Sequence, residues 1–333
     1  MRVLIVLPGA LGDVVRALPL LGRLRRARPE AWIGWAVEPP SAPLLAGHPW
    51  LNEVIVFERA GGGRAFLAFL RRVRAGGWTM TIDLGRSLKS GIVARASRAG
   101  QRLGFARADG REANWLFANV HVAEQGVERP KLEQFLAFGD ALGLPPAPVE
   151  FGLAPTAAEA HDADVLLQGL ARPIVAACVG SSCPSRRWFP DRTAEVLRTL
   201  RARDRASAVL LGTAADAGFA ADVARRSEGA VRDLVGRTSL RQLLAILGRA
   251  QLAFGPDSGA LHLAAAVGVP TVSLWGATSA ARSAPWGSEA LAVTGTAPCA
   301  PCFLKSCPIG RVCMRTIGPD AVTGAWRAAR HGT

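Results

Sequence analysis

The chain has 333 residues, a length typical of about two domains, and half of them are hydrophobic. That composition supplies sizeable cores and excludes a disordered chain or a disulfide-stapled miniprotein. The formal net charge of +14 indicates an anionic partner. The arginines are dispersed and tyrosine is absent, so the basic and aromatic rows of a single-strand nucleic-acid binder are missing. A phosphate-rich small ligand or an anionic membrane surface fits better.

The N-terminal half alternates apolar strands with amphipathic helices. The first strand is a continuous apolar run, as expected of a strand buried on both faces, and a glycine-containing turn follows it. We predict strands at 2–7, 32–37, 53–57 and 79–83. We predict helices at 14–27, 64–75, 88–97 and 131–142.

A proline-rich linker at 145–155 precedes a second block of the same kind. In this block we predict strands at 173–179, 207–211, 251–254 and 271–274, and helices at 190–203 and 240–249. Two such blocks predict an α/β protein with two doubly wound, Rossmann-like parallel sheets facing across a cleft, as domains 1–150 and 151–333. Ligands bind beyond the carboxyl ends of such strands. The loops of interest are therefore 8–13, 180–187, 212–216 and 255–259.

The loop at 255–259 reads Gly-Pro-Asp-Ser-Gly and leads from a strand into a helix that starts at Ser258 or Gly259. Free backbone N–H groups and the dipole at this helix start suit a diphosphate, which the glycines allow to approach closely. A purely structural role is the alternative. Asp257 or Ser258 would then be an N-cap, and His262 a buried histidine of the core.

The loop at 180–190 carries the side chains best suited to phosphate oxygens. Ser181 and Ser182 offer hydroxyl donors, and Arg186 and Arg187 offer guanidinium forks. Solvated surface arginines are the alternative in a chain so rich in arginine. The position of the loop at the end of a strand favours the binding role.

Asp13 follows the turn that contains Gly9 and Gly12. The turn has neither a P-loop ending nor the GxGxxG pattern, so no motif supports nucleotide binding there. An N-cap is one interpretation of Asp13. The other is a general base that faces the phosphate loops from the opposite wall of the cleft, the arrangement for displacement at a sugar carbon.

Four cysteines lie close together in the sequence, at Cys299, Cys302, Cys307 and Cys313. No secretory signal is expected, because Pro8, Gly9 and Asp13 interrupt the apolar start of the chain. In a cytoplasmic protein, clustered cysteines either hold zinc or remain reduced thiols that pack a loop.

Several motifs together resemble the glycosyltransferase family 9 heptosyltransferases of lipopolysaccharide core assembly, from residue 1 to about 325. They are Leu-Pro-Gly-Ala-Leu-Gly-Asp at 7–13, Gly-Ser-Ser with Arg-Arg-Trp at 180–188, the block from Gly255 to Pro270 and Leu-Trp-Gly-Ala-Thr at 274–278. The cysteine-rich tail looks like that of many members of the second-heptose type.

The resemblance implies a GT-B fold and inverting, metal-independent transfer of heptose from ADP-heptose to a phosphorylated, lipid-linked acceptor. Domain 1–150 would bind the acceptor. Domain 151–333, with segment 299–313 and a C-terminal helix, would bind the nucleotide sugar.

The resemblance also assigns residues. It makes Asp13 the catalytic base and Asp257, Ser258, Gly259 and His262 the donor loop. Arg186 stands where many members carry a lysine, and Asp216 is the nearest match to a glutamate on the ribose. No cofactor is implied.

Two alternatives stay open at this point. The nearer one is a transferase of the same fold that uses another nucleotide sugar to build a cell-surface glycan. This alternative stays open because the Asp216 side chain is shorter than the glutamate that it matches. The other is a non-catalytic protein that binds nucleotides or nucleic acid, for which the net charge is the argument. We expect a cytoplasmic enzyme with peripheral contact to the inner membrane. Candidates for that contact are Arg23, Arg25, Arg26, Arg28, Arg71, Arg72 and Arg74.

Overall fold

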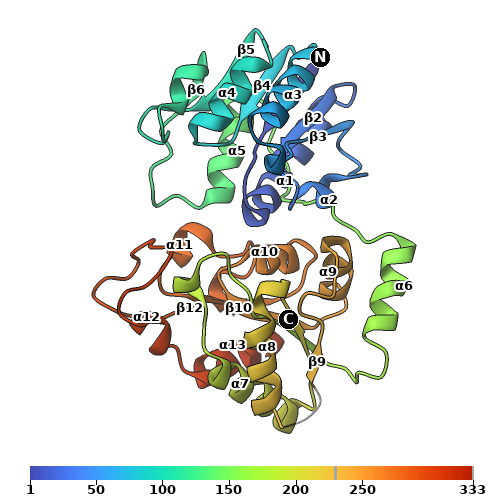
Figure 1. Cartoon of the computed structure of the whole chain (residues 1–333), viewed down its shortest axis with the longest axis vertical. Coiled ribbons are helices and arrows are strands. Elements are labelled where there is room, and N and C mark those ends of the chain that lie inside the picture. The colour runs from blue at the N-terminus through green and yellow to red at the C-terminus, as the bar shows by residue number, and fades with distance from the viewer. Residues whose placement is uncertain (229–230, 332–333) are drawn as a thin grey trace. The chain divides into compact units, whose positions relative to one another are not determined.

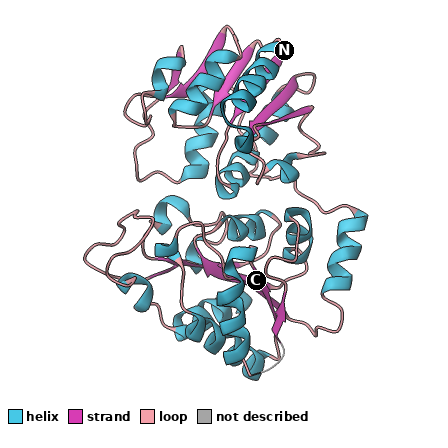
Figure 2. Cartoon of the chain, in the orientation of Figure 1, coloured by secondary structure: helices cyan, strands magenta, loops and turns pink. Residues whose placement is uncertain are grey.

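The computed structural model describes residues 1–228 and 231–331, and the chain divides into two units, Met1–Gly152 and Leu153–Thr333. Figure 1 colours the first unit blue to green and the second green to red. Each unit contains one six-stranded sheet in which all neighbouring strands pair in parallel. Helices lie on both sides of the strands in each unit (Figure 2). The predicted α/β class with two doubly wound sheets is confirmed.

The first unit has the strand order β3-β2-β1-β4-β5-β6. Its strands are β1 (Arg2–Val6), β2 (Trp32–Val37), β3 (Glu53–Val56), β4 (Met80–Asp83), β5 (Gln101–Phe105) and β6 (Val120–Val122). Its helices are α1 (Leu11–Ala27), α2 (Ala42–Leu45), α3 (Gly62–Ala75), α4 (Leu88–Ala96) and α5 (Lys131–Ala141). Because the order reverses at β1, the loops that follow β1 and β4 form the switch point where such sheets bind ligands.

The second unit has the strand order β12-β11-β10-β7-β8-β9. Its strands are β7 (Ile174–Cys178), β8 (Ser207–Leu211), β9 (Val231–Asp233), β10 (Leu252–Pro256), β11 (Thr271–Trp275) and β12 (Val293–Thr294). Its helices are α6 (Ala157–Leu166), α7 (Pro190–Asp204), α8 (Ala217–Arg226), α9 (Leu240–Leu247), α10 (Gly259–Ala266), α11 (Ala280–Ser283), α12 (Val312–Arg315) and α13 (Pro319–His331). Here the switch point lies between β7 and β10.

Local signals in the sequence start several of these helices. Thr156 with Glu159, and Ser239 with Gln242, form reciprocal capping boxes at α6 and α9. Pro190 occupies the first position of α7, where its missing N–H group costs nothing. Buried apolar residues of the strands and of the inner helix faces then make a separate core in each unit.

Candidate active site

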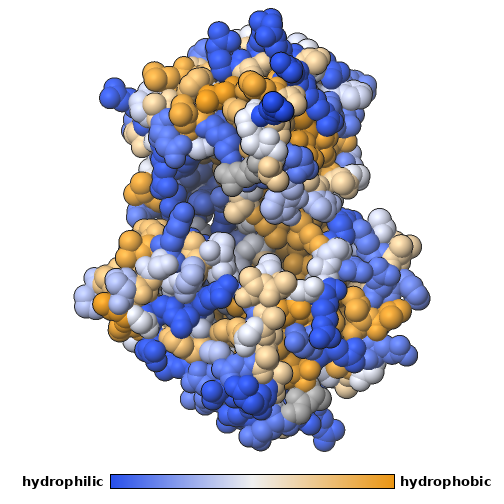
Figure 3. Space-filling model, viewed as in Figure 1, coloured by the Kyte–Doolittle hydropathy of each residue, from blue (hydrophilic) through white to orange (hydrophobic). Residues whose placement is uncertain are grey.

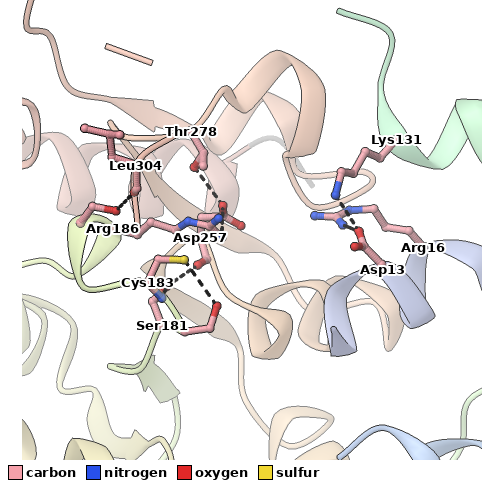
Figure 4. A network of polar contacts seen from close by, with 11 residues as sticks. Asp13, Arg16, Lys131, Ser181, Cys183, Arg186, Asp257, Thr278 and Leu304 are labelled. Carbon is pink, nitrogen blue, oxygen red and sulfur yellow. Dashed lines mark hydrogen bonds and ion pairs between the residues drawn. The ribbon is translucent and has the colours of Figure 1, made fainter. Parts of the chain in front are cut away.

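Asp257 joins three loops at the switch point of the second unit (Figure 4). Its Oδ2 accepts a hydrogen bond from Thr278 Oγ1 at 2.9 Å and lies 3.0 Å from Arg186 Nη1. Its backbone carbonyl accepts a hydrogen bond from Ser181 Oγ at 3.0 Å. The loops after β7, β10 and β11 therefore meet on one buried carboxylate residue.

A glycine permits this close meeting of loops. Gly255 on β10 has a φ of +154°, and a Cβ there would lie 2.1 Å from the carbonyl oxygen of Cys178 on β7. Any side chain at this position would push β7 and β10 apart. The glycine thus sets the distance between the two loops that hold Ser181 and Asp257.

Asp216 makes a second carboxylate contact in the same unit. Its Oδ2 accepts hydrogen bonds from the backbone N–H of Thr213 at 3.0 Å and from Thr213 Oγ1 at 2.8 Å. Its Oδ1 lies 2.8 Å from Arg187 Nη2, and the side chain is 3% exposed. Asp216 thus caps the short 3₁₀ turn Ala214–Asp216 and holds one of the two candidate phosphate-binding arginines.

Helix α10 begins with a hydroxyl that the helix does not use. Ser258 is the N-cap residue, yet its side chain makes no capping hydrogen bond. Its Oγ is enclosed and has no hydrogen-bond partner, and the same holds for Nε of Arg186. Gly259 opens the helix, and His262 is buried one turn further on. Two enclosed polar atoms and the free N–H groups of a helix start suit an anionic ligand group.

Ser182 has less contact with these loops than the other predicted residues. It is exposed, and its Oγ lies 3.9 Å from Sγ of the neighbouring Cys183. The structure therefore brings Ser181, Arg186, Asp257 and Ser258 to one switch point, with Arg187 held by Asp216.

Asp13 lies in the first turn of α1, at the switch point of the first unit. Its Oδ1 is 2.6 Å from Arg16 Nη1 and 2.9 Å from Lys131 Nζ (Figure 4). The Asp13 side chain is 28% exposed. Gly12 is buried beside it, and Gly9 is half-buried. Two cations and the positive end of the α1 helix dipole therefore lie next to the Asp13 carboxylate.

Sequence reasoning missed Lys131, Arg16 and Thr278 as members of these contacts. A signal for Lys131 was available, because only three of the 40 basic residues are lysines. For Thr278 the signal was its place in the 274–278 motif directly after β11.

In the described residues the clustered cysteines are not arranged as a zinc site, which was one of the two alternatives for them. All six are free, and no group of three or more His, Cys, Asp or Glu side chains in residues 1–228 and 231–331 is arranged to hold a metal ion. Burial raises the pKa of Cys313, and it raises the pKa of Cys178 to about 12. Both buried thiols therefore stay protonated near neutral pH and are poor nucleophiles.

Comparison with known proteins relates this arrangement to a family. The model of glycosyltransferase family 9 (heptosyltransferase) matches residues 66–313. Lipopolysaccharide heptosyltransferase 1 of Pseudomonas aeruginosa is 28% identical over 322 residues, which cover 92% of this chain and 87% of that protein.

Solved structures share the fold. The ADP-heptose lps heptosyltransferase II of E. coli superposes with a TM-score of 0.80 at 22% identity, covering 100% of both chains. The E. coli heptosyltransferase WaaC with ADP-2-deoxy-2-fluoro heptose gives a TM-score of 0.75 at 22% identity, over 98% of this chain and 99% of that one. The predicted GT-B fold is confirmed.

Proposed function

The chain belongs to glycosyltransferase family 9, and from this premise we propose that it transfers heptose from ADP-heptose to the inner core of lipopolysaccharide. The family makes it a glycosyltransferase. The identity of the donor is supported by a solved structure of the same fold that holds ADP-2-deoxy-2-fluoro heptose. The observation that carries the proposal is the set of cationic and unpaired polar groups at the switch point of the second unit.

In this proposal the diphosphate of the donor binds where β7 and β10 end. The N–H groups at the start of α10, Ser258 Oγ and Arg186 Nε all have unused donor capacity there. Each guanidinium has five N–H donors, so Arg186 and Arg187 keep donors for phosphate oxygens while their carboxylate partners hold them in place. Ser181, Ser182, Asp257, Gly259 and His262 complete the proposed donor site, with Asp216 behind Arg187.

Asp13 is the proposed catalytic base. As an acceptor hydroxyl attacks the anomeric carbon, its proton passes to an Asp13 carboxylate oxygen and a new C–O bond forms. The bond between the anomeric carbon and the diphosphate oxygen breaks, and ADP leaves with the electron pair. Because attack and departure take place on opposite faces, the configuration inverts. Arg16 and Lys131 hold Asp13 Oδ1, which fixes the orientation of the carboxylate.

The charge that develops on the leaving ADP is met by protein groups in this proposal. Arg186, Arg187 and the helix start at Ser258–Gly259 supply the positive potential that a divalent cation supplies in other transferases. Transfer is therefore expected to proceed without added metal and in the presence of EDTA.

The acceptor is proposed to be a phosphorylated glycolipid, bound by the N-terminal unit at the cytoplasmic face of the inner membrane. No helix in the described part of the chain is long and apolar enough to cross a bilayer. Contact with the membrane would then be peripheral and electrostatic.

The first test is calorimetric titration with ADP, UDP, GDP and dTDP in EDTA. A preference for ADP supports the proposed donor, and preference for another nucleotide would keep the fold and replace the sugar donor. Binding of none of them, with salt-sensitive affinity for nucleic acid, would favour a non-catalytic binding protein.

The second test concerns Asp13. Asp13→Asn keeps the shape of the side chain and removes the base, so transfer should fall by about 10²–10⁴-fold. ADP affinity should stay at the wild-type value, because the proposed donor site lies in the other unit. Loss of ADP affinity together with activity would make Asp13 a structural residue.

A further inference from the structure

The cysteine-rich segment, residues 299–313, contacts the proposed phosphate loop through its backbone. The N–H of Ser185 donates to the carbonyl of Lys305 at 3.1 Å, and Ser185 Oγ donates to the carbonyl of Leu304. On the other side, the N–H of Phe303 donates to the carbonyl of Ala277 at 2.7 Å. The segment thus connects the loop after β7 to the loop after β11, and both loops also meet at Asp257.

Arg311 adds a side-chain contact from the same segment. Its Nη1 donates to the carbonyls of Arg187 at 2.8 Å and of Trp188 at 3.2 Å. Its guanidinium lies 4.5 Å from the centre of the Phe189 ring. Burial, followed by the nearby charges of Arg315 and Arg187, lowers the pKa of Arg311. A partly desolvated cation is therefore held against the backbone of the loop that carries Arg186 and Arg187.

The loop needs such support because it has little regular structure of its own. Between β7 and α7, the chain forms a single 3₁₀ turn over Pro184–Arg186 and then continues in extended conformation at Arg187. A loop of this kind gains its fixed shape from contacts with neighbouring groups. Ser185 and the carbonyls of Arg187 and Trp188 are the points where the cysteine-rich segment supplies them.

From these contacts we propose that Arg311 is a positioning residue of the donor site, which fixes the peptides of Arg187 and Trp188 so that Arg186 and Arg187 face the donor phosphates. This inference rests on the proposed function. Arg311 acts through the loop, and its charge adds to the positive potential beside Arg187. The cysteine-rich segment is then part of the donor site.

The test compares ADP affinity in Arg311→Ala and Arg315→Ala, measured by calorimetry on the full chain. Arg315 is a matched control, because its guanidinium lies 4.6 Å from the same Phe189 ring but bonds to the carbonyl of Gly310 instead of the phosphate loop. Arg311→Ala should weaken ADP binding about tenfold, whereas Arg315→Ala should stay within about twofold of the wild type. The ADP affinity of Arg311→Lys should lie between those of the two alanine variants, since the lysine ammonium keeps the charge but lacks the planar fork of the guanidinium.

Measurements of transfer kinetics distinguish a role of Arg311 in positioning the phosphate loop from a role in stabilising the fold. In Arg311→Ala the KM for the donor should rise and the KM for the acceptor should stay unchanged. Ser185→Ala, which removes the bond to the Leu304 carbonyl without changing charge, should weaken ADP binding in the same direction and provides a second variant if Arg311→Ala folds poorly.

The possible outcomes differ clearly. If Arg311→Ala and Arg315→Ala lose ADP affinity equally, the loss comes from the change in net charge and the inference is overturned. The inference is also overturned if Arg311→Ala and Ser185→Ala both bind ADP as tightly as the wild type. If the wild-type protein binds none of the four nucleotides, the proposed function fails and this inference fails with it.

Discussion

At the scale of single residues, Asp216 shows how contacts change the role that a motif suggests. Its match to a ribose-binding glutamate predicts a carboxylate that faces the nucleoside. In the structure both oxygens are engaged, one by Thr213 and the other by Arg187. A Cβ on Gly180 would lie 2.5 Å from Asp216 Oδ2, so the side chain is packed tightly against the end of β7. We therefore expect Asp216 to act on the donor through Arg187.

This expectation can be tested with ADP and 2′-deoxy-ADP. Asp216→Asn keeps an acceptor for Thr213 but removes the charge that holds Arg187, so affinity for both nucleotides should fall about tenfold, as for a lost charge-assisted contact. The ratio of the two affinities should match that of the wild type. A variant that loses only the preference for ADP would instead place Asp216 on the ribose hydroxyls.

The sequence predicted which loops lie at the strand ends, but it did not predict how their side chains pair. Strand ends, glycines and hydroxyls are local features, so Ser181, Asp257 and Ser258 could be selected by position. The pairs Arg186–Asp257, Arg187–Asp216 and Lys131–Asp13 join segments between 29 and 118 residues apart. Such pairings depend on strand order, which periodicity does not reveal. Arg311 was missed for the same reason.

At the scale of elements, long apolar strands were predicted well and short or polar ones were missed. The predicted strands at 32–37 and 207–211 match β2 and β8 residue for residue. β5 begins with Gln101 and Arg102 and contains Gly104, so no apolar run marks it. β6, β9 and β12 have three residues or fewer and lie at sheet edges. Pairing with a neighbouring strand, rather than propensity, forms these elements.

Strand β4 ends in a buried acid that the proposed mechanism does not use. Asp83 lies beside Val6 of β1, and it accepts hydrogen bonds from the N–H of Gly85 at 2.9 Å and from Asn114 Nδ2 at 2.8 Å. Burial raises the pKa of Asp83 to about 8, although the hydrogen bonds oppose that rise. In the folded protein Asp83 therefore keeps its proton at neutral pH, while in the unfolded chain it loses the proton near pH 4.

Asp83 should accordingly make the protein less stable as the pH rises. Between about pH 4 and pH 8 the folded state binds one more proton than the unfolded state, so the free energy of unfolding falls across this window. The asparagine in Asp83→Asn cannot ionise. The fall in unfolding free energy that Asp83 causes between about pH 4 and pH 8 should therefore be absent in this variant. The difference between variant and wild type should change by more than about 1 kcal/mol from pH 5 to pH 8 in denaturant unfolding.

A suitable control is Asp109→Asn, since Asp109 is also a buried aspartate of the first unit and accepts N–H groups of Gln125 and Gly126. This substitution should leave the decline with pH in place. If the unfolding free energy of Asp83→Asn falls with pH as much as that of the wild type, Asp83 is already ionised in the folded protein.

At the scale of the whole molecule, the net charge overstates how many arginines can meet a partner. Arg23 is only 8% exposed and donates to the carbonyls of Leu144 and Pro145. Arg25 donates to the carbonyl of Trp50. Such arginines satisfy backbone carbonyls inside the fold, which removes Arg23 from the predicted membrane contacts. On the face shown in Figure 3, hydrophilic residues are spread over both units.

Helix α3 keeps the strongest candidates for membrane contact. Arg71 and Arg74 are exposed one turn apart, while Phe69 and Val73 of the same helix are buried in the core. Exposed cations near an anionic bilayer contribute about 1 kcal/mol each, and salt screens them. We therefore expect the protein to sediment with vesicles that contain phosphatidylglycerol at low salt and to be released at about 0.5 M salt.

Reversing two charges at a time tests whether vesicles bind one particular face of the protein or respond to its net charge. Arg71→Glu with Arg74→Glu should abolish most vesicle binding, because attraction at this face becomes repulsion. Arg201→Glu with Arg203→Glu changes the net charge by the same amount at exposed positions of α7 in the second unit, and it should bind vesicles nearly as well as the wild type. Equal loss in the two double variants would assign the attraction to the charge of the whole molecule. Binding that survives high salt in the wild type would point to apolar insertion instead, because screening does not weaken the burial of apolar surface.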